Sequence, residues 1–188
     1  GCGSAMIKNP ENAKEIIRAA KRGAKTGKEG GIPVSVKTRL GYNQDQLEEW
    51  LPELLSENPA VVTIHARTRK EMSKVPARWE RIKRAVEIRD REGSDSLIFG
   101  NGDVESVADA KEKVEETGAD GAMLGRAIFG NPWLFHPDKD LSNVSLEERL
   151  WVMVEHTKLF EKILPNKNFK KIKKHYKAYV NGFDGAKE

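Results

Sequence analysis

Apolar residues recur at helical spacing along much of the chain and predict a series of amphipathic helices. The first helix begins after Asn9-Pro10, which supplies an N-cap and a proline at the first helical position. This helix is predicted to end near Gly27. Two more helices are marked by the same spacing, at Leu47, Trp50, Leu51, Leu54 and Leu55 in one and at Trp79, Ile82, Ala85 and Val86 in the other.

Short apolar runs between these helices predict four strands, at residues 34–40, 61–65, 97–99 and 122–124. Strict alternation of strand and helix is typical of a parallel sheet with helices packed outside it. Four strands do not close a barrel, and an eight-stranded barrel takes about 250 residues. The fold class is therefore α/β, either as an open sheet or as the C-terminal half of a (β/α)8 TIM barrel.

The pattern changes to helices alone after Asp138. Ser145 and Glu148 form a capping box, and the apolar stripe that follows it runs to Ile163. Pro165 ends this helix, and residues 169–180 predict a second one. We expect a βα domain over residues 1–138 and the start of a helical domain over residues 139–188.

The composition of the chain excludes several classes of protein. The chain has 188 residues, of which 38% are hydrophobic and 33% charged, with a net charge of +4. No apolar run approaches the roughly 20 residues that span a membrane, and no signal peptide opens the sequence, which favours the cytoplasm. One cysteine and four scattered histidines give neither a disulfide framework nor a metal-binding pattern.

Polar and basic residues gather where the predicted strands end. Because a parallel barrel places its active site at these ends, the residues there are candidates for chemistry. They are Lys37, Arg39, His65, Arg67, Arg69, Asn101, Asp103 and Arg126. A strand lysine or a lone histidine is often only structural. Their coincidence at all four strand ends favours a binding site for an anion.

Glycines follow the last two strands at once, in Gly100-Asn101-Gly102-Asp103 and Gly125-Arg126. Glycine lets a backbone approach a ligand closely, and a helix that begins there directs free N–H groups outward. Residues 127–129 could form the short extra helix that completes a phosphate site in barrels of this type. The sequence thus predicts a phosphate site at these two turns.

Four motifs at the strand ends resemble those of the tRNA-dihydrouridine synthases. They are residues 34–41, Thr63-Ile64-His65-Ala66-Arg67-Thr68-Arg69, Gly100-Asn101-Gly102-Asp103, and residues 125–133. The segment 174–179, with Gly182 and Gly185, is similar to a motif of the family's helical tRNA-binding domain. The resemblance implies an FMN-dependent oxidoreductase that uses NADPH to reduce a uridine of tRNA.

The resemblance also assigns roles to particular residues. Lys37 and His65 would contact the flavin ring, where a cation favours the reduced, anionic form. The ribityl phosphate would be held by Asn101, Gly102, Asp103, Gly125 and Arg126. RNA would be contacted by Arg67, Arg69, Lys170, Lys171, Lys174, His175 and Lys177. The last five belong to a lysine-rich stretch at residues 167–177. Either of the two arginines could instead support the groups that hold the phosphate.

The family's general acid is a cysteine in an Asn-x-Gly-Cys-Pro loop, and Cys2 does not match it because Gly3 follows. We expect that loop shortly upstream of Gly1, so the chain contains no catalytic residue and should be inactive alone. Two alternatives remain open. One is another FMN-dependent barrel that acts on a small metabolite, and the other is a non-catalytic RNA-binding remnant.

Overall fold

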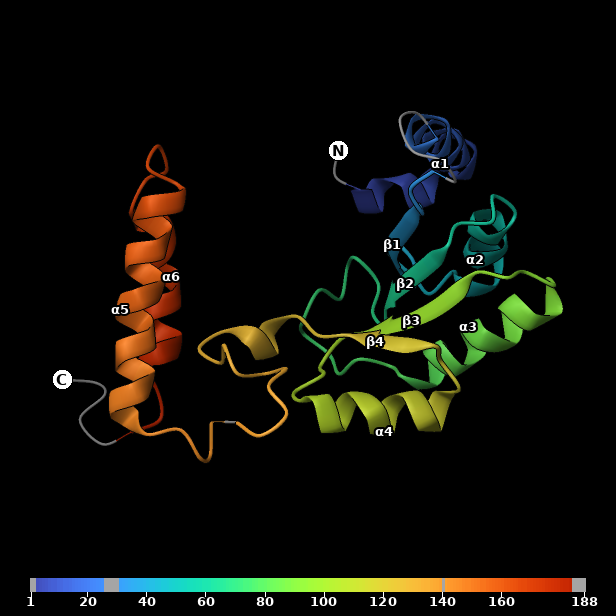
Figure 1. Ribbon diagram of the computed structural model, residues 1–188. Coiled ribbons are helices and arrows are strands. Elements are labelled where there is room, and N and C mark those ends of the chain that lie inside the picture. The colour runs from blue at the N-terminus through green and yellow to red at the C-terminus, as the bar shows by residue number, and fades with distance from the viewer. Residues whose placement is uncertain (1–2, 26–30, 140, 184–188) are drawn as a thin grey trace. The chain divides into compact units, whose positions relative to one another are not determined.

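The computed structural model describes residues 3–25, 31–139 and 141–183, in two compact units, Gly1–Gly125 and Arg126–Glu188 (Figure 1). Each unit is described by itself. The expected boundary between residues 138 and 139 falls inside the second unit. Cys2, Gly27 and Gly185, which the sequence analysis singled out, lie outside the described residues.

A four-stranded parallel sheet forms the centre of the first unit, and its strands follow the order of the chain, β1-β2-β3-β4. Their bounds are Ser35–Arg39, Val61–His65, Leu97–Asn101 and Gly121–Met123. The predicted α/β class with four parallel strands is confirmed. Sequential order is that of a barrel wall, whereas a doubly wound sheet reverses its order at a switch point. This arrangement favours the half-barrel interpretation over the open sheet.

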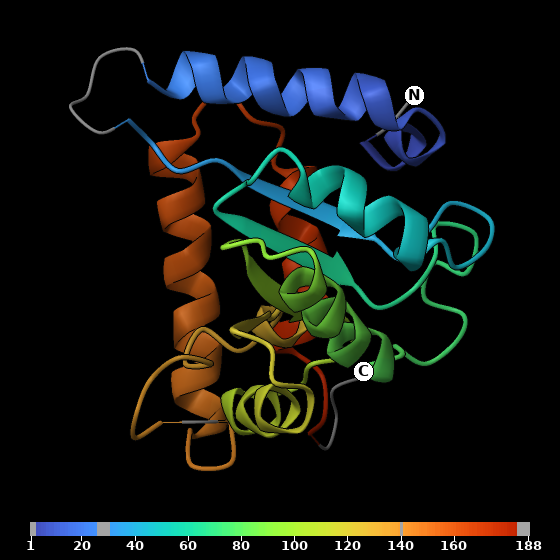
Figure 2. The ribbon, with the colours of Figure 1, turned by 90° about the vertical axis from the view of Figure 1, so that its right-hand side faces the viewer.

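Four α-helices lie on one face of this sheet (Figure 2). They are α1 (Pro10–Ala24), α2 (Leu47–Leu55), α3 (Glu80–Arg91) and α4 (Val107–Thr117), and a 3-10 helix, η1 (Gly3–Lys8), precedes them. The predicted cap of α1 is present, because Asn9 Oδ1 accepts a hydrogen bond from Asn12 N over 3.1 Å. Ser106 caps α4 in the same way, and Gly118, with φ of 70°, ends it.

The core lies between the helices and the sheet. Successive strand residues point to opposite faces, so Val62, Ile64 and Ile98 enter the core and are fully buried. Leu51, Leu54 and other apolar residues of the helices pack against them. The other face of the sheet therefore receives the residues between these positions, including the polar ones near the strand ends.

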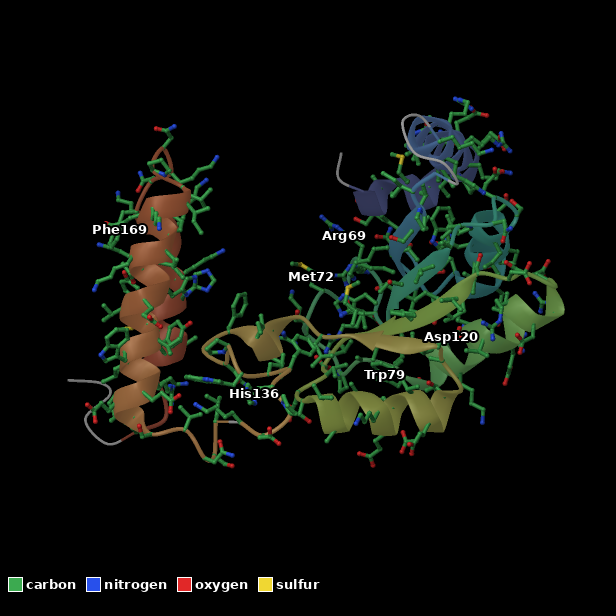
Figure 3. All side chains as sticks on the ribbon, viewed as in Figure 1. Arg69, Met72, Trp79, Asp120, His136 and Phe169 are labelled. Atoms are coloured by element: carbon green, nitrogen blue, oxygen red, sulfur yellow. The ribbon has the colours of Figure 1, made fainter. Side chains whose placement is uncertain are left out.

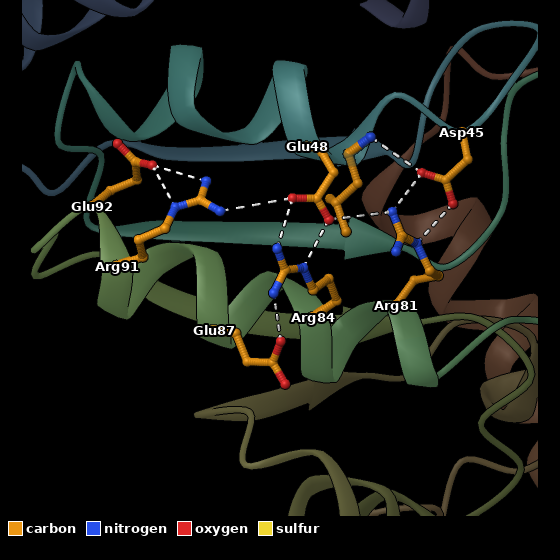
Figure 4. Close-up of polar contacts among 8 residues, drawn as sticks. Asp45, Glu48, Arg81, Arg84, Glu87, Arg91 and Glu92 are labelled. Atoms are coloured by element: carbon orange, nitrogen blue, oxygen red, sulfur yellow. Dashed lines mark hydrogen bonds and ion pairs between the residues drawn. The ribbon is translucent and has the colours of Figure 1, made fainter.

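Ion pairs join α2 to α3 on the surface of the first unit (Figure 4). Glu48 accepts from Arg84 at 2.7 Å, while Arg81 pairs with Asp45 at 2.8 Å and Arg84 also with Glu87 at 2.8 Å. Exposed pairs of this kind stabilise a fold by about 0–1 kcal/mol each. The arginines here are matched by carboxylates, so this surface offers little net attraction for an anion.

The second unit contains the short 3-10 helix η2 (Arg126–Ile128) and two α-helices, α5 (Leu146–Ile163) and α6 (Lys170–Tyr179). The predicted cap is present, because Ser145 Oγ accepts from Glu148 N at 3.1 Å. Within this unit, the backbone of Gly130 packs closely against α6, because a Cβ added to Gly130 would lie 2.5 Å from Ala178 O. Across the described residues, every helix is too short or too polar to cross a membrane.

Candidate functional site

The face of the sheet opposite α1–α4 carries the polar residues predicted at the strand ends, and we call it the site face. Arg39, His65, Asn101 and Met123 occupy one row across β1, β2, β3 and β4. Lys37 stands two residues earlier on β1 and so points to the same face. The parallel register therefore brings together side chains that lie far apart in the sequence, as expected.

Lys37 and Asn101 are joined across the intervening strand β2. Lys37 Nζ donates to Asn101 Oδ1 at 2.8 Å, and Asn101 Nδ2 donates to Met123 O at 2.7 Å. The amide of Asn101 is thus oriented by two partners on different strands. It fixes the ammonium group of Lys37 over the site face.

The turn after β3 is built from a glycine and an aspartate with positive φ, 121° at Gly102 and 51° at Asp103. Trp79 Nε1 donates to Gly102 O at 2.9 Å, and Ala77 N donates to Asp103 Oδ2 at 2.9 Å. A Cβ on Gly102 would lie 2.9 Å from Ala77 Cβ and 3.0 Å from His65 Cδ2. Only glycine fits this close approach.

Trp79 and Ala77 support this turn, although the sequence pattern predicts no part for them in the site. Trp79 stands at the start of α3, and its ring fills the space over Gly100, where a Cβ would lie 2.3 Å from the ring. The glycine of the strand and the tryptophan 21 positions earlier show no pattern that links them. Their contact exists only because β3 and the segment before α3 are neighbours in the fold.

Arg67 has surroundings that differ from those expected. It is 2% exposed, with its guanidinium group against His65, Asp103 and the carbonyl of Val75. A buried and fully engaged guanidinium cannot meet an RNA backbone, so the expected RNA contact does not fit this residue.

Arg69, labelled in Figure 3, is exposed in the loop after β2. It lies over the ring of Tyr42, with 5.4 Å between its Cζ and the ring centroid. Lys8 Nζ lies 3.8 Å from the centroid of the same ring. Cations stack on aromatic faces because the ring quadrupole is negative there. Arg69 therefore stays available to an anionic partner, and its contact with RNA remains a prediction.

Positive charge is in excess on the site face. Burial and the nearby Arg39 lower the pKa of Lys37, and burial together with Arg67 and Arg69 lowers the pKa of Arg39. Burial, Arg39, Lys37 and Arg67 lower the pKa of His65 to about 4. Burial is the largest cause of all three shifts, and repulsion among the cations adds to it. A bound anion would relieve that repulsion.

Gly125 and Arg126, predicted to complete the phosphate site, stand on either side of the division between the two units. Gly125 is exposed, and a Cβ on it would meet nothing within 4 Å. Arg126 begins η2, which agrees with the short helix expected near residues 127–129. The place of both residues in a phosphate site remains a prediction.

The lysines of α6 form one face of that helix. Lys170, Lys171, Lys174 and Lys177 are exposed, whereas Ile172 and Tyr179 on the opposite side are buried. Exposed lysines in this arrangement can approach a phosphate backbone, so the predicted RNA contact fits their positions.

His175 lies on the side of α6 and is half-buried. Its ring packs 5.5 Å from Phe129 and 5.3 Å from His156, measured between centroids. Burial, aided by His156, lowers the pKa of His175. The contacts make it a packing residue, and an RNA contact by this histidine remains a prediction. In the described parts of the chain, His, Cys, Asp and Glu form no group of three or more that could hold a metal ion.

Comparison with known proteins gives one consistent result. The family model described as dihydrouridine synthase (Dus) matches residues 1–188. Probable tRNA-dihydrouridine synthases of Staphylococcus epidermidis and Staphylococcus aureus are 41% and 40% identical, and the alignments cover 100% of this chain and 56% of each relative. The probable tRNA-dihydrouridine synthase 2 of Bacillus subtilis is 40% identical with the same coverage. The chain thus spans about half the length of the curated relatives it matches.

Proposed function

Because the chain belongs to the dihydrouridine synthase family, we propose that it is part of a tRNA-dihydrouridine synthase. The reaction is the reduction of the C5–C6 double bond of a uridine in tRNA, with FMN as cofactor and NADPH as the source of electrons. The activity is proposed for the protein at its full natural length. The tRNA substrate would place it in the cytoplasm.

The observation that carries this proposal is the excess of cations on the site face. Lys37, Arg39 and Arg67 stand there beside the carboxylate of Asp103, which is already held by Arg67 and Ala77 N. Glu71 is a second carboxylate that acts on Arg39. FMN bears an anionic phosphate and a ring that gains negative charge on reduction, and so fits a site of this charge. When bound, FMN supplies hydride transfer.

Different residues of the chain would bind different parts of FMN. Lys37, oriented by Asn101, would place its ammonium beside the flavin ring, and His65 would present a ring nitrogen next to it. Gly102 would allow the phosphate to approach the backbone, and Gly125 leaves open space for the same purpose. The carboxylate of Asp103 holds the turn in shape, and the family resemblance assigns Asp103 to the phosphate site.

Arg126 would add a fixed positive charge to the phosphate site, since it follows Gly125 directly in the chain. Its guanidinium is permanently charged and can bind a phosphate through two parallel hydrogen bonds. Arg126 is exposed at the start of η2.

For the substrate, the lysine face of α6 and the exposed Arg69 supply positive charge for the RNA backbone. The relatives reported above are named as probable tRNA-dihydrouridine synthases, which favours RNA over a small metabolite. The site face with its cations favours an enzyme over a remnant that only binds RNA. Each alternative from the sequence analysis is therefore the weaker explanation.

We further propose that the 188-residue polypeptide alone forms no dihydrouridine. The family resemblance assigns the general acid to a cysteine within Asn-x-Gly-Cys-Pro, and this sequence holds one cysteine, Cys2, in a different context. His65 on the site face is neutral at neutral pH and so is not a ready proton donor to uracil. Cys2 itself lies outside the described residues.

The direct test is an assay of the full-length protein with FMN, NADPH and unmodified tRNA, in which dihydrouridine is measured by mass spectrometry of nuclease digests. We expect dihydrouridine to form only when FMN is present. Lys37→Met should lower the rate, whereas Lys83→Met, on the exposed side of α3, should not. Absence of product with folded, FMN-loaded protein would overturn the proposed activity.

A further inference from the structure

Arg67 connects three segments of the first unit through different nitrogens of its guanidinium group. Nε donates to Val75 O at 2.6 Å, Nη1 lies 3.2 Å from His65 Nε2, and Nη2 pairs with Asp103 Oδ2. The side chain is 3% exposed. Arg67 therefore joins the end of β2, the loop before α3 and the turn after β3, with no face left for solvent.

The contact with His65 decides which ring nitrogen of that histidine carries hydrogen. Arginine keeps all five of its N–H donors in a folded protein and has no acceptor. Nη1 can therefore only donate to His65, and Nε2 must accept with its lone pair. His65 is then the neutral tautomer with its hydrogen on Nδ1.

The charges around His65 maintain this neutral form. Lys37 and Arg39 from β1 and Arg67 after β2 repel a second proton, and the carboxylate of Asp103 after β3 favours it. Asp103 already accepts from Arg67 and from Ala77 N. Burial acts in the same direction as the cations, and the pKa of His65 falls to about 4.

The ring is oriented by the turn after β3. A Cβ on Gly102 would lie 3.0 Å from His65 Cδ2 and 3.2 Å from Nε2, so this edge of the imidazole rests against the turn. Nδ1 belongs to the opposite edge of the ring. Within the described part of the chain, the one hydrogen bond of the His65 ring is that with Arg67. The Nδ1–H group is thus free to donate to a ligand on the site face.

We propose that Arg67 is a positioning residue that holds His65 as the Nδ1–H tautomer, so that His65 presents a hydrogen-bond donor to an acceptor atom of the ligand. This rests on the proposed function, in which that acceptor belongs to the flavin ring. A neutral donor complements an acceptor without adding a further charge to a site that already carries three cations. It also gives Arg67 a role other than contact with RNA.

The experiment is two-dimensional ¹H–¹⁵N NMR of the histidine rings in the full-length protein, labelled with ¹⁵N-histidine and free of FMN. Long-range couplings from the ring protons distinguish the two neutral tautomers and the charged form, and His65→Gln identifies the His65 signals. We expect the Nδ1–H pattern throughout pH 5.5–8. Hydrogen on Nε2 in the wild-type protein would overturn the proposal without any variant of Arg67.

Variants then test the role of Arg67 itself. Arg67→Lys keeps the positive charge but loses the planar set of guanidinium N–H donors, and Arg67→Met loses both the charge and the donors. Each should allow hydrogen on Nε2, and Arg67→Met should raise the pKa of His65 toward 6.5 as well. Arg69→Lys, two residues further on and exposed, should leave the His65 signals unchanged. An unaltered tautomer in both folded Arg67 variants would contradict the positioning role.

Binding of FMN is measured separately, by quenching of flavin fluorescence, so the two proposals fail independently. An Nδ1–H tautomer in a protein that binds no FMN would support the positioning role and refute the flavin site. An Nε2–H tautomer in a protein that binds FMN would refute the positioning role and leave the flavin site standing.

Discussion

Lys37 reaches across β2 to donate a hydrogen bond to Asn101, with 2.8 Å between Nζ and Oδ1. The two residues are 64 positions apart and belong to strands that are not neighbours. An ammonium held in this way has lost most of its freedom before a ligand arrives, which lowers the entropic cost of binding. The pair therefore links the fold of the sheet to the proposed chemistry of its site face.

Asp103 should be important for stability because it is the carboxylate partner of the buried Arg67. Asp103→Ala leaves that cation without its charged acceptor, and we expect a loss of about 2 kcal/mol in the free energy of unfolding. Glu87→Ala removes the exposed pair with Arg84 and should cost well under about 1 kcal/mol. Urea unfolding of both variants checks this, and equal losses would contradict it.

Gly102→Ala should damage both the fold and the site. Its φ of 121° is strained for any residue with a Cβ, and the added atom would lie 2.9 Å from Ala77 Cβ. Gly118→Ala is the matched control, because Gly118 also has positive φ, 70°, but its Cβ would meet nothing within 4 Å. We expect a cost of about 1 kcal/mol for the control and a larger one for Gly102→Ala.

The two glycine variants are compared by thermal unfolding and by FMN titration. Gly102→Ala should bind FMN more weakly at a temperature where both variants are folded, whereas Gly118→Ala should bind it normally. Similar unfolding temperatures and similar FMN affinities for the two would show that the turn after β3 is not constrained as described.

Stability should fall in mild acid because of His65. Its pKa is about 4 in the folded protein against 6.5 ordinarily, so between these values the unfolded chain binds a proton that the folded chain does not. The contribution is fully present above pH 6.5 and is lost as the pH falls through this window toward 4. Carboxylates titrate in the same range, so the wild type must be compared with His65→Gln.

Urea unfolding at pH 7, 5.5 and 4.5 measures this contribution. We expect the wild type to lose more stability than His65→Gln on going from pH 7 to pH 4.5. Parallel losses in the two proteins would mean that the pKa of His65 is not lowered by folding.

The lysine face of α6 should bind RNA through its backbone. Replacing Lys170, Lys174 and Lys177 together by Gln removes up to three phosphate contacts, so the slope of log K against log salt should decrease by about two. Replacing Lys25, Lys83 and Lys111, which are exposed in the first unit, is the control with the same change of charge. Filter binding of tRNA between low and moderate salt gives both slopes, and identical slopes would refute the assignment.

The strands could be predicted from the sequence because short apolar, β-branched runs that end at a glycine are typical of β-strands. Their ends were less predictable. Residues 97–99 were expected, whereas β3 continues to Asn101 because Asn101 pairs with His65 on the neighbouring strand. Where a strand ends depends on its pairing with neighbouring strands in the fold. The β-propensity of the segment alone does not predict that pairing.

Arg67 illustrates the same limit for the site. A polar residue directly after a strand can face solvent or turn inward, and the sequence pattern is the same in both cases. Its partner Asp103 lies 36 positions away and becomes a neighbour only when β2 and β3 pair. Lys37 and His65 were easier to place, because alternation along a strand fixes their face.

The measurement that tests the central claim most directly is titration of the full-length protein with FMN, followed by flavin fluorescence. We expect saturable binding that Lys37→Met weakens about tenfold or more, since a hydrogen bond from a charged group contributes about 1.5–3 kcal/mol. Lys83→Met should bind FMN as the wild type does. Equal FMN affinity in the wild type and in folded Lys37→Met would contradict the assignment of the site face as the flavin site.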